Sequence, residues 1–147
     1  MTTVDVEVHA TIERPRTEVA RYCCDPDNAP AWQANIDSVQ WETDGPLTLG
    51  SRLRFTSGFL GRSLEYTYEV TGLVPAQRLV LRSDQSPFLM ETTYTFSDTD
   101  EGDTWMTVRS RGDPTAYAAL SAPILATAIR RAATLDLARL KTLLEHH

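Results

Sequence analysis

A chain of 147 residues, 41% of them apolar and 23% charged, is long enough for one hydrophobic core and too short for several. Its net charge of −6 argues against nucleic acid and anionic membranes as partners, because both require a basic surface. No apolar run is as long as a membrane span, and the first residues lack the basic and apolar regions of a signal peptide. We therefore expect a cytoplasmic protein.

The N-terminal part of the chain predicts one strand and two short helices. Apolar and polar residues alternate over Val4–Ile12, as is typical of a strand with one buried face. Apolar residues then recur at helical spacing until Asp25-Pro26 ends the first helix. A second helix fits residues 28–33, with Trp32 as its large apolar contact.

The middle of the chain predicts a series of strands joined by short breaks. Alternating segments are separated by turn residues such as Asp44-Gly45-Pro46 and Gly112-Asp113-Pro114. The expected strands cover residues 36–43, 53–59, 64–70, 79–82, 90–96 and 105–110. Short strands with short connections favour an antiparallel meander.

The stretch Ser121–Leu143 predicts one long helix. Ser121 can cap it, and Pro123 lies in the first turn, where a missing N–H is harmless. The side chains expected on its apolar face are Leu125, Ala128, Ile129, Ala132, Leu135, Leu140 and Leu143. A long helix that ends a strand-rich chain needs a sheet to lie on, and such an arrangement usually leaves a cavity between the two.

The residues after Leu143 have the composition of a cloning site followed by a purification tag. We therefore treat residues 1–143 as a single domain and exclude residues 144–147 from functional reasoning.

Histidine and cysteine are sparse in this chain. Cys23 and Cys24 are adjacent, so neither a disulfide framework nor a zinc site is supported, and we expect buried free thiols on a helix. His9, the one histidine outside the tail, falls on the outward face of its strand. We therefore expect no metal, no cofactor and no catalysis by a nucleophile paired with histidine.

The inward faces of the expected sheet carry aromatic and hydroxyl-bearing side chains where a plain core would use Val, Ile and Leu. Such faces suit a cavity for a mostly apolar ligand. On the helix, Asp136 and Arg139 are three residues apart and can meet, either facing the cavity or as a pair at its edge. The expected lining is Trp41, Phe55, Phe59, Tyr66, Tyr68, Met90, Tyr94, Ile129 and Ala132, with Asp136 and Arg139 as polar contacts.

Short segments along Val4 to Leu143 carry a resemblance to a known family. They include Ile12-Glu13-Arg14-Pro15, Pro30-Ala31-Trp32, Phe59-Leu60-Gly61-Arg62, Arg78-Leu79-Val80, Thr93-Tyr94-Thr95-Phe96 and Asp136-Leu137. In order and spacing they resemble the polyketide cyclase/dehydrase-like branch of the START/Bet v 1 (SRPBCC) superfamily. One departure is Asp103, which separates Gly102 from Thr104 where the family often runs Gly-Thr directly.

This resemblance implies an α+β helix-grip fold, in which a curved antiparallel sheet and two short helices wrap around a long C-terminal helix. It also implies a deep apolar cavity, although it does not imply an activity. We expect this cavity to bind a hydrophobic or aromatic small molecule, lipid- or polyketide-like, in a monomer or homodimer. One alternative is a polyketide cyclase or dehydratase that uses cavity Tyr, Arg or Asp. Another is a protein-binding, co-chaperone-like module with a filled core. The resemblance carries over no catalytic residue.

Overall fold

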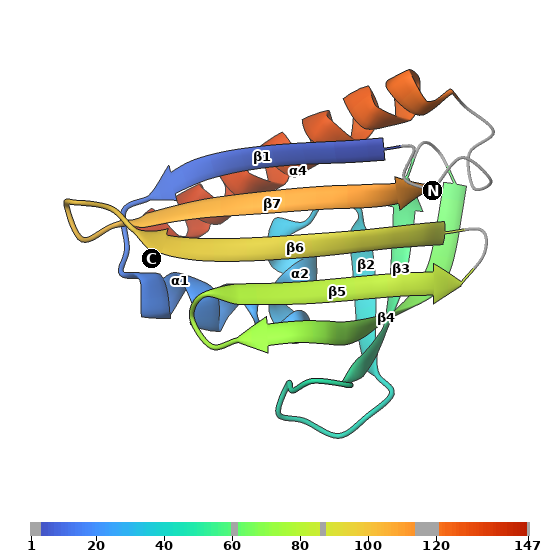
Figure 1. Cartoon of the computed structure of the whole chain (residues 1–147), viewed down its shortest axis with the longest axis horizontal. Helices are drawn as coiled ribbons and strands as arrows, with labels where there is room; N and C mark the ends of the chain where they lie inside the picture. Colours follow the sequence, from blue (N-terminus) through green and yellow to red (C-terminus); the bar gives the residue numbers. More distant parts are fainter. Residues whose placement is uncertain (1–3, 60–61, 86–87, 114–120, 147) are drawn as a thin grey trace.

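The computed structural model describes residues 4–59, 62–85, 88–113 and 121–146. Within these ranges the strands form one antiparallel sheet of order β1-β7-β6-β5-β4-β3-β2, and the long helix α4 lies along β1 (Figure 1). The elements are β1 (Val4–Ile12), α1 (Arg16–Cys23), the 3₁₀ helix η1 (Pro26–Asn28), α2 (Ala29–Trp32), β2 (Ile36–Trp41), β3 (Arg52–Phe59), β4 (Arg62–Val74), β5 (Arg78–Gln85), β6 (Phe88–Asp98), β7 (Thr104–Asp113) and α4 (Ala122–Glu145). This is the helix-grip fold that the resemblance implies.

The curvature of the sheet is concentrated at β4. Residues 62–69 of this strand pair with β3, whereas residues 69–74 pair with β5, with a bulge between Val70 and Gly72. A bulge bends and twists its strand. A Cβ at Gly72 would lie 2.9 Å from Val80 Cγ2, so glycine permits the close approach of β5 here. As a result β2 and β3 cross the direction of β5, β6 and β7 steeply, and the sheet becomes a cup (Figure 1).

The buried face of α4 differs from the prediction. Its buried residues are Leu125, Leu137, Leu140 and Leu144, whereas Leu135 is 55% and Leu143 36% exposed. The spacing of apolar residues defines only a broad arc, and the position of α4 along β1 decides which part of that arc is covered. Ser121 is at the N-cap position as expected, but its side chain makes no capping hydrogen bond.

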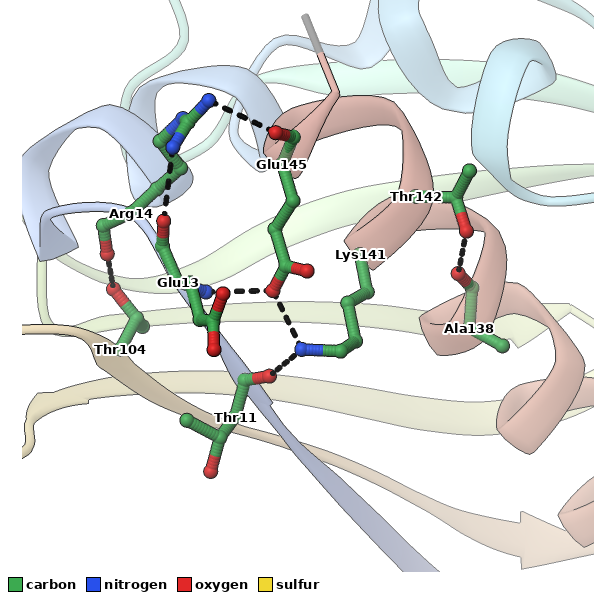
Figure 2. A network of polar contacts seen from close by, with 8 residues as sticks. All are labelled: Thr11, Glu13, Arg14, Thr104, Ala138, Lys141, Thr142 and Glu145. Atoms are coloured by element: carbon green, nitrogen blue, oxygen red, sulfur yellow. Dashed lines mark hydrogen bonds and ion pairs between the residues drawn. The ribbon is translucent and has the colours of Figure 1, made fainter.

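The C-terminal end of α4 is fastened to the end of β1 by polar contacts (Figure 2). The Glu145 carboxylate accepts hydrogen bonds from the Glu13 backbone N–H, at 2.7 Å, and from Lys141 Nζ. Lys141 also donates to the Thr11 carbonyl at 2.9 Å, and Arg14 donates to the Glu145 carbonyl at 3.1 Å. The helix therefore continues in ordered packing through Leu144 and Glu145, two residues past Leu143.

The described helices and the two cysteines can also be compared with what the sequence predicted. None of the described helices is long and apolar enough to cross a membrane. Cys23 is a buried free thiol at the end of α1, as expected, whereas Cys24 is a half-buried free thiol at the C-cap position.

Candidate functional site

A pocket of about 170 Å³ lies between the inner face of the sheet and α4. Strands β3 to β7 supply half of its lining residues, and the α1–α2 segment closes one end with residues that include Cys23, Cys24 and Trp32. From α4, Ala132 and Ala133 contribute small side chains, which leave space between helix and sheet that larger residues would fill.

Most of the residues expected at the site meet around this pocket. Those that line it are Phe55, Tyr66, Tyr68, Met90, Tyr94, Ile129, Ala132 and Asp136. Trp41 and Arg139 do not line it, and the side chain of Phe59 lies outside the described part of the structure. The role of the lining residues in ligand binding stays a prediction.

The two tryptophans near the pocket have different environments. Trp41 lies at the edge of the core and donates its Nε1–H to Asp27 Oδ1 at 3.0 Å. Trp32 lines the pocket, is 2% exposed and packs edge-on against Tyr94, with ring centroids 5.9 Å apart. Its buried Nε1–H has no hydrogen-bond partner among the described residues. Sequence reasoning missed Trp32 as a wall residue, although its place in a short helix before β2 was the available signal.

Aromatic rings and neutral hydroxyls dominate the sheet side of the pocket. The rings of Phe55, Tyr66 and Tyr68 pack with centroids 5.2 to 5.9 Å apart. The Tyr68 hydroxyl contacts Thr92 Oγ1 at 3.3 Å, and burial raises the pKa of Tyr68 to about 12. Burial also raises the pKa of Tyr94 well above its ordinary value. Both phenols are therefore neutral at pH 7 and can donate hydrogen bonds to a ligand.

The thiols in the pocket wall are protonated as well. Burial raises the pKa of Cys23 well above its ordinary value and that of Cys24 to about 11, so neither thiol is an activated nucleophile. Outside the pocket, His9 stacks on Trp105 with ring centroids 4.4 Å apart. The described residues contain no group of three or more His, Cys, Asp or Glu arranged to hold a metal ion.

Asp136 is the acidic group of the pocket wall. Its Oδ1 accepts a hydrogen bond from the Ala34 backbone N–H at 3.1 Å and lies 3.8 Å from Arg139 Nη1. Burial raises its pKa, although the Ala34 hydrogen bond and the Arg139 charge act in the opposite direction. The Asp136 side chain is 16% exposed and that of Arg139 44% exposed. Of the two arrangements that the sequence left open, Asp136 faces the cavity, whereas Arg139 reaches outward.

Residues 3–145 match the model of the family described as polyketide cyclase/dehydrase and lipid transport. The chain belongs to this family. The resemblance seen in the sequence is thereby confirmed over nearly the whole chain. Among proteins with curated descriptions, none matches the sequence.

Solved structures from this superfamily share the fold at low sequence identity. A START superfamily protein from Mycobacterium smegmatis is 14% identical with a TM-score of 0.81, covering 97% of each chain. The Zhui aromatase/cyclase from Streptomyces sp. R1128 is 17% identical with a TM-score of 0.80, over 99% of this chain and 94% of that one. The di-domain ARO/CYC BexL is 18% identical with a TM-score of 0.74, over 96% of this chain and 46% of that one.

This member of the polyketide cyclase/dehydrase and lipid transport family has a second, more open depression beside the pocket. This groove, of about 730 Å³, runs along α4 from Pro123 to Arg139 and is bordered by Ala34 and Asn35. Its apolar floor includes Ile124 and Leu135, each 55% exposed. The polar groups along it include two arginines, Arg131 and Arg139.

Proposed function

We propose that this protein binds a small hydrophobic or aromatic molecule in the pocket between the sheet and α4. The observation that carries the proposal is the composition of the wall, in which aromatic and aliphatic side chains surround a few neutral hydroxyls and one carboxyl group. A mostly apolar wall with few polar groups is the usual design of a small-molecule site. The family description, which names polyketide cyclase/dehydrase and lipid transport, supports this function.

The size of the pocket restricts the ligand. Its volume of about 170 Å³ is below the roughly 300–1,000 Å³ of drug-sized sites and close to the ~150 Å³ of a dry cavity that binds benzene. The pocket therefore accommodates about one aromatic ring or a short alkyl segment. A larger molecule must extend beyond the pocket wall.

Filling the pocket tests this proposal. Ala133 lines the pocket but not the groove, so Ala133→Leu adds volume inside the pocket alone. Ala138→Leu, at an exposed position on the same helix, is the matched control. We expect indole and acetophenone to bind the wild type and Ala138→Leu saturably in calorimetry, and Ala133→Leu to lose this binding. The proposal fails if neither molecule binds, or if Ala133→Leu binds as well as the control.

A second candidate is ring closure with loss of water, a cyclase or dehydratase activity. The family description supports it, as does the position of Asp136, whose carboxyl group has a raised pKa in the same wall as the neutral Tyr68 and Tyr94. The test uses a linear poly-β-ketone, in which an aldol step forms one C–C bond and dehydration releases one water. We expect mass spectrometry to show faster water loss with the wild type than with Asp136→Asn. A rate equal to that in buffer alone excludes this activity for that substrate.

A further inference from the structure

We infer that the pocket and the groove form one continuous site whose ligand is an amphipathic carboxylate, with an apolar ring in the pocket and its carboxylate in the groove. This extends the function proposed above and depends on it, because the ring must occupy the pocket. The two depressions share three wall residues, Asn35, Ala132 and Asp136, so they lie side by side with these side chains at their boundary.

Few polar contacts hold α4 closed over this junction. The Ala34 N–H bonds to Asp136 at 3.1 Å, and Arg139 Nη1 donates to the Trp32 carbonyl at 3.4 Å, beyond the usual hydrogen-bond length. The last turn of α4, beyond this junction, is fixed by the Glu145 contact with the Glu13 N–H and by the Lys141 contact with the Thr11 carbonyl. A ligand that extends from the pocket into the groove therefore has to displace the Ala34–Asp136 and Trp32–Arg139 contacts and can leave those of the last turn intact.

The volumes and surfaces match a ligand with two parts. The pocket holds about one ring, so the remainder of a longer ligand must lie elsewhere. The groove provides this space, and Ile124, Ala128 and Leu135 supply an apolar surface for an alkyl tether. Covering Ile124 and Leu135, each 55% exposed, would remove apolar surface from water and so favour binding.

The charges of the groove specify the other part of the ligand. Arg131 and Arg139 are eight residues apart on α4, or about 12 Å along the helix axis. The Arg131 side chain has neither a hydrogen bond nor an ion pair with the other described residues, whereas Arg139 Nη1 lies 3.8 Å from Asp136 Oδ1. Two guanidinium groups against one carboxylate make the groove locally positive in a chain of net charge −6. Guanidinium groups bind oxyanions such as carboxylates in paired hydrogen bonds, which is the role we infer for the ligand's carboxylate.

The test compares phenylalkanoates of increasing tether length, from phenylacetate to 6-phenylhexanoate, with their primary amides. Calorimetry at pH 7.5 and low salt is run on the wild type, Arg131→Gln, Arg139→Gln and Arg21→Gln. The last is a control on α1, where an exposed arginine lines neither depression. We expect one tether length to be best and its acid to bind about tenfold more tightly than its amide. Arg131→Gln and Arg139→Gln should reduce this preference, and Arg21→Gln should retain it.

The remaining outcomes separate this inference from the proposed function. If acid and amide bind equally and Ala133→Leu abolishes both, the pocket binds ligands but the carboxylate inference fails. If the acid binds unchanged to Ala133→Leu, the groove acts alone and the continuous site is excluded. If Arg21→Gln reduces the preference for the acid over the amide as much as Arg131→Gln does, the preference comes from the net charge of the protein and the groove site is excluded. If no acid, amide or neutral ring binds, the proposed function itself fails.

Discussion

Asp136 Oδ1 accepts the backbone N–H of Ala34 at 3.1 Å, and this contact joins α4 to the segment between α2 and β2 where the pocket meets the groove. The Asp136 side chain is only 16% exposed, and burial raises its pKa above the ordinary value of 3.8 despite this hydrogen bond and Arg139. The folded protein therefore binds the Asp136 proton more tightly than the unfolded chain does, so ionisation of Asp136 destabilises the fold.

The first prediction concerns Asp136→Asn, which keeps an acceptor oxygen for Ala34 and removes the charge. Below the ordinary pKa of 3.8 the carboxyl group is protonated in both states and carries no ionisation penalty, whereas above the raised folded pKa the penalty is fully present. We expect Asp136→Asn to raise the free energy of unfolding at pH 7, and this gain to shrink as the pH falls toward 3.8. Urea unfolding at several pH values measures it, with Asp100→Asn in the exposed β6–β7 turn as control. If the gain in the free energy of unfolding is the same at all pH values, it does not come from the ionisation of Asp136.

The second prediction concerns the unpaired indole of Trp32. A ketone oxygen beside it would accept the buried Nε1–H, whereas a hydrocarbon of the same shape would not. We expect wild-type protein to prefer acetophenone over isopropylbenzene, and Trp32→Phe to reduce this preference by ~0.5–1.5 kcal/mol, the net value of a neutral hydrogen bond. Trp41→Phe is the matched control, because the Trp41 N–H is already bonded to Asp27. Competition calorimetry with both ligands measures this preference. If Trp32→Phe and Trp41→Phe reduce the preference equally, a specific role of Trp32 is excluded.

The sequence predicted the strands well because alternation reports directly which face of a strand is buried. Over Val4–Ile12 the expected and observed strands coincide. Alternation does not report changes of strand partner, so the sequence did not predict that β4 extends through Gly72 to Val74. Periodicity also could not show that Trp32 lines the pocket and Trp41 does not. The Trp41 N–H is bonded to Asp27, a residue outside the strands, and strand alternation carries no information on this contact.

The same limit applies to α4, where local pattern predicted the helix but not its orientation. Leu125 and Leu140 are buried as expected, whereas Leu135 lies in the groove and Leu137 faces the core. Only the tertiary packing of the helix along β1 distinguishes these positions. The groove therefore could not be predicted from the sequence, although the spacing of Asp136 and Arg139 predicted that these two side chains can meet.

The third prediction concerns Glu145, in the tail whose composition resembles a cloning site. We expect Glu145→Ala to lower the free energy of unfolding at pH 7 by about 1 kcal/mol, because the Glu13 N–H and Lys141 lose their acceptor. Burial acts to raise the pKa of Glu145, but Lys141 and the Glu13 N–H outweigh it and hold the pKa below the ordinary value of 4.5. The contribution is therefore present above pH 4.5 and lost as the pH falls through the folded pKa. Thermal unfolding measures this contribution, with Glu101→Ala as an exposed control. If Glu145→Ala is as stable as the wild type, the Glu145 contacts contribute nothing to stability.

The fourth prediction concerns the ionisation of Tyr68, whose pKa burial raises to about 12 from an ordinary value of 10. Between these values the unfolded chain loses the Tyr68 proton while the folded protein retains it, so the fold loses stability as the pH rises from 10 toward 12. We expect Tyr68→Phe to show a shallower loss of stability over this range, at the cost of the Thr92 contact at neutral pH. Tyrosinate absorbance and urea unfolding, recorded together from pH 9 to about 12, measure both effects. If the variant and the wild type lose stability in parallel, the Tyr68 hydroxyl is open to solvent and its burial in the pocket wall is excluded.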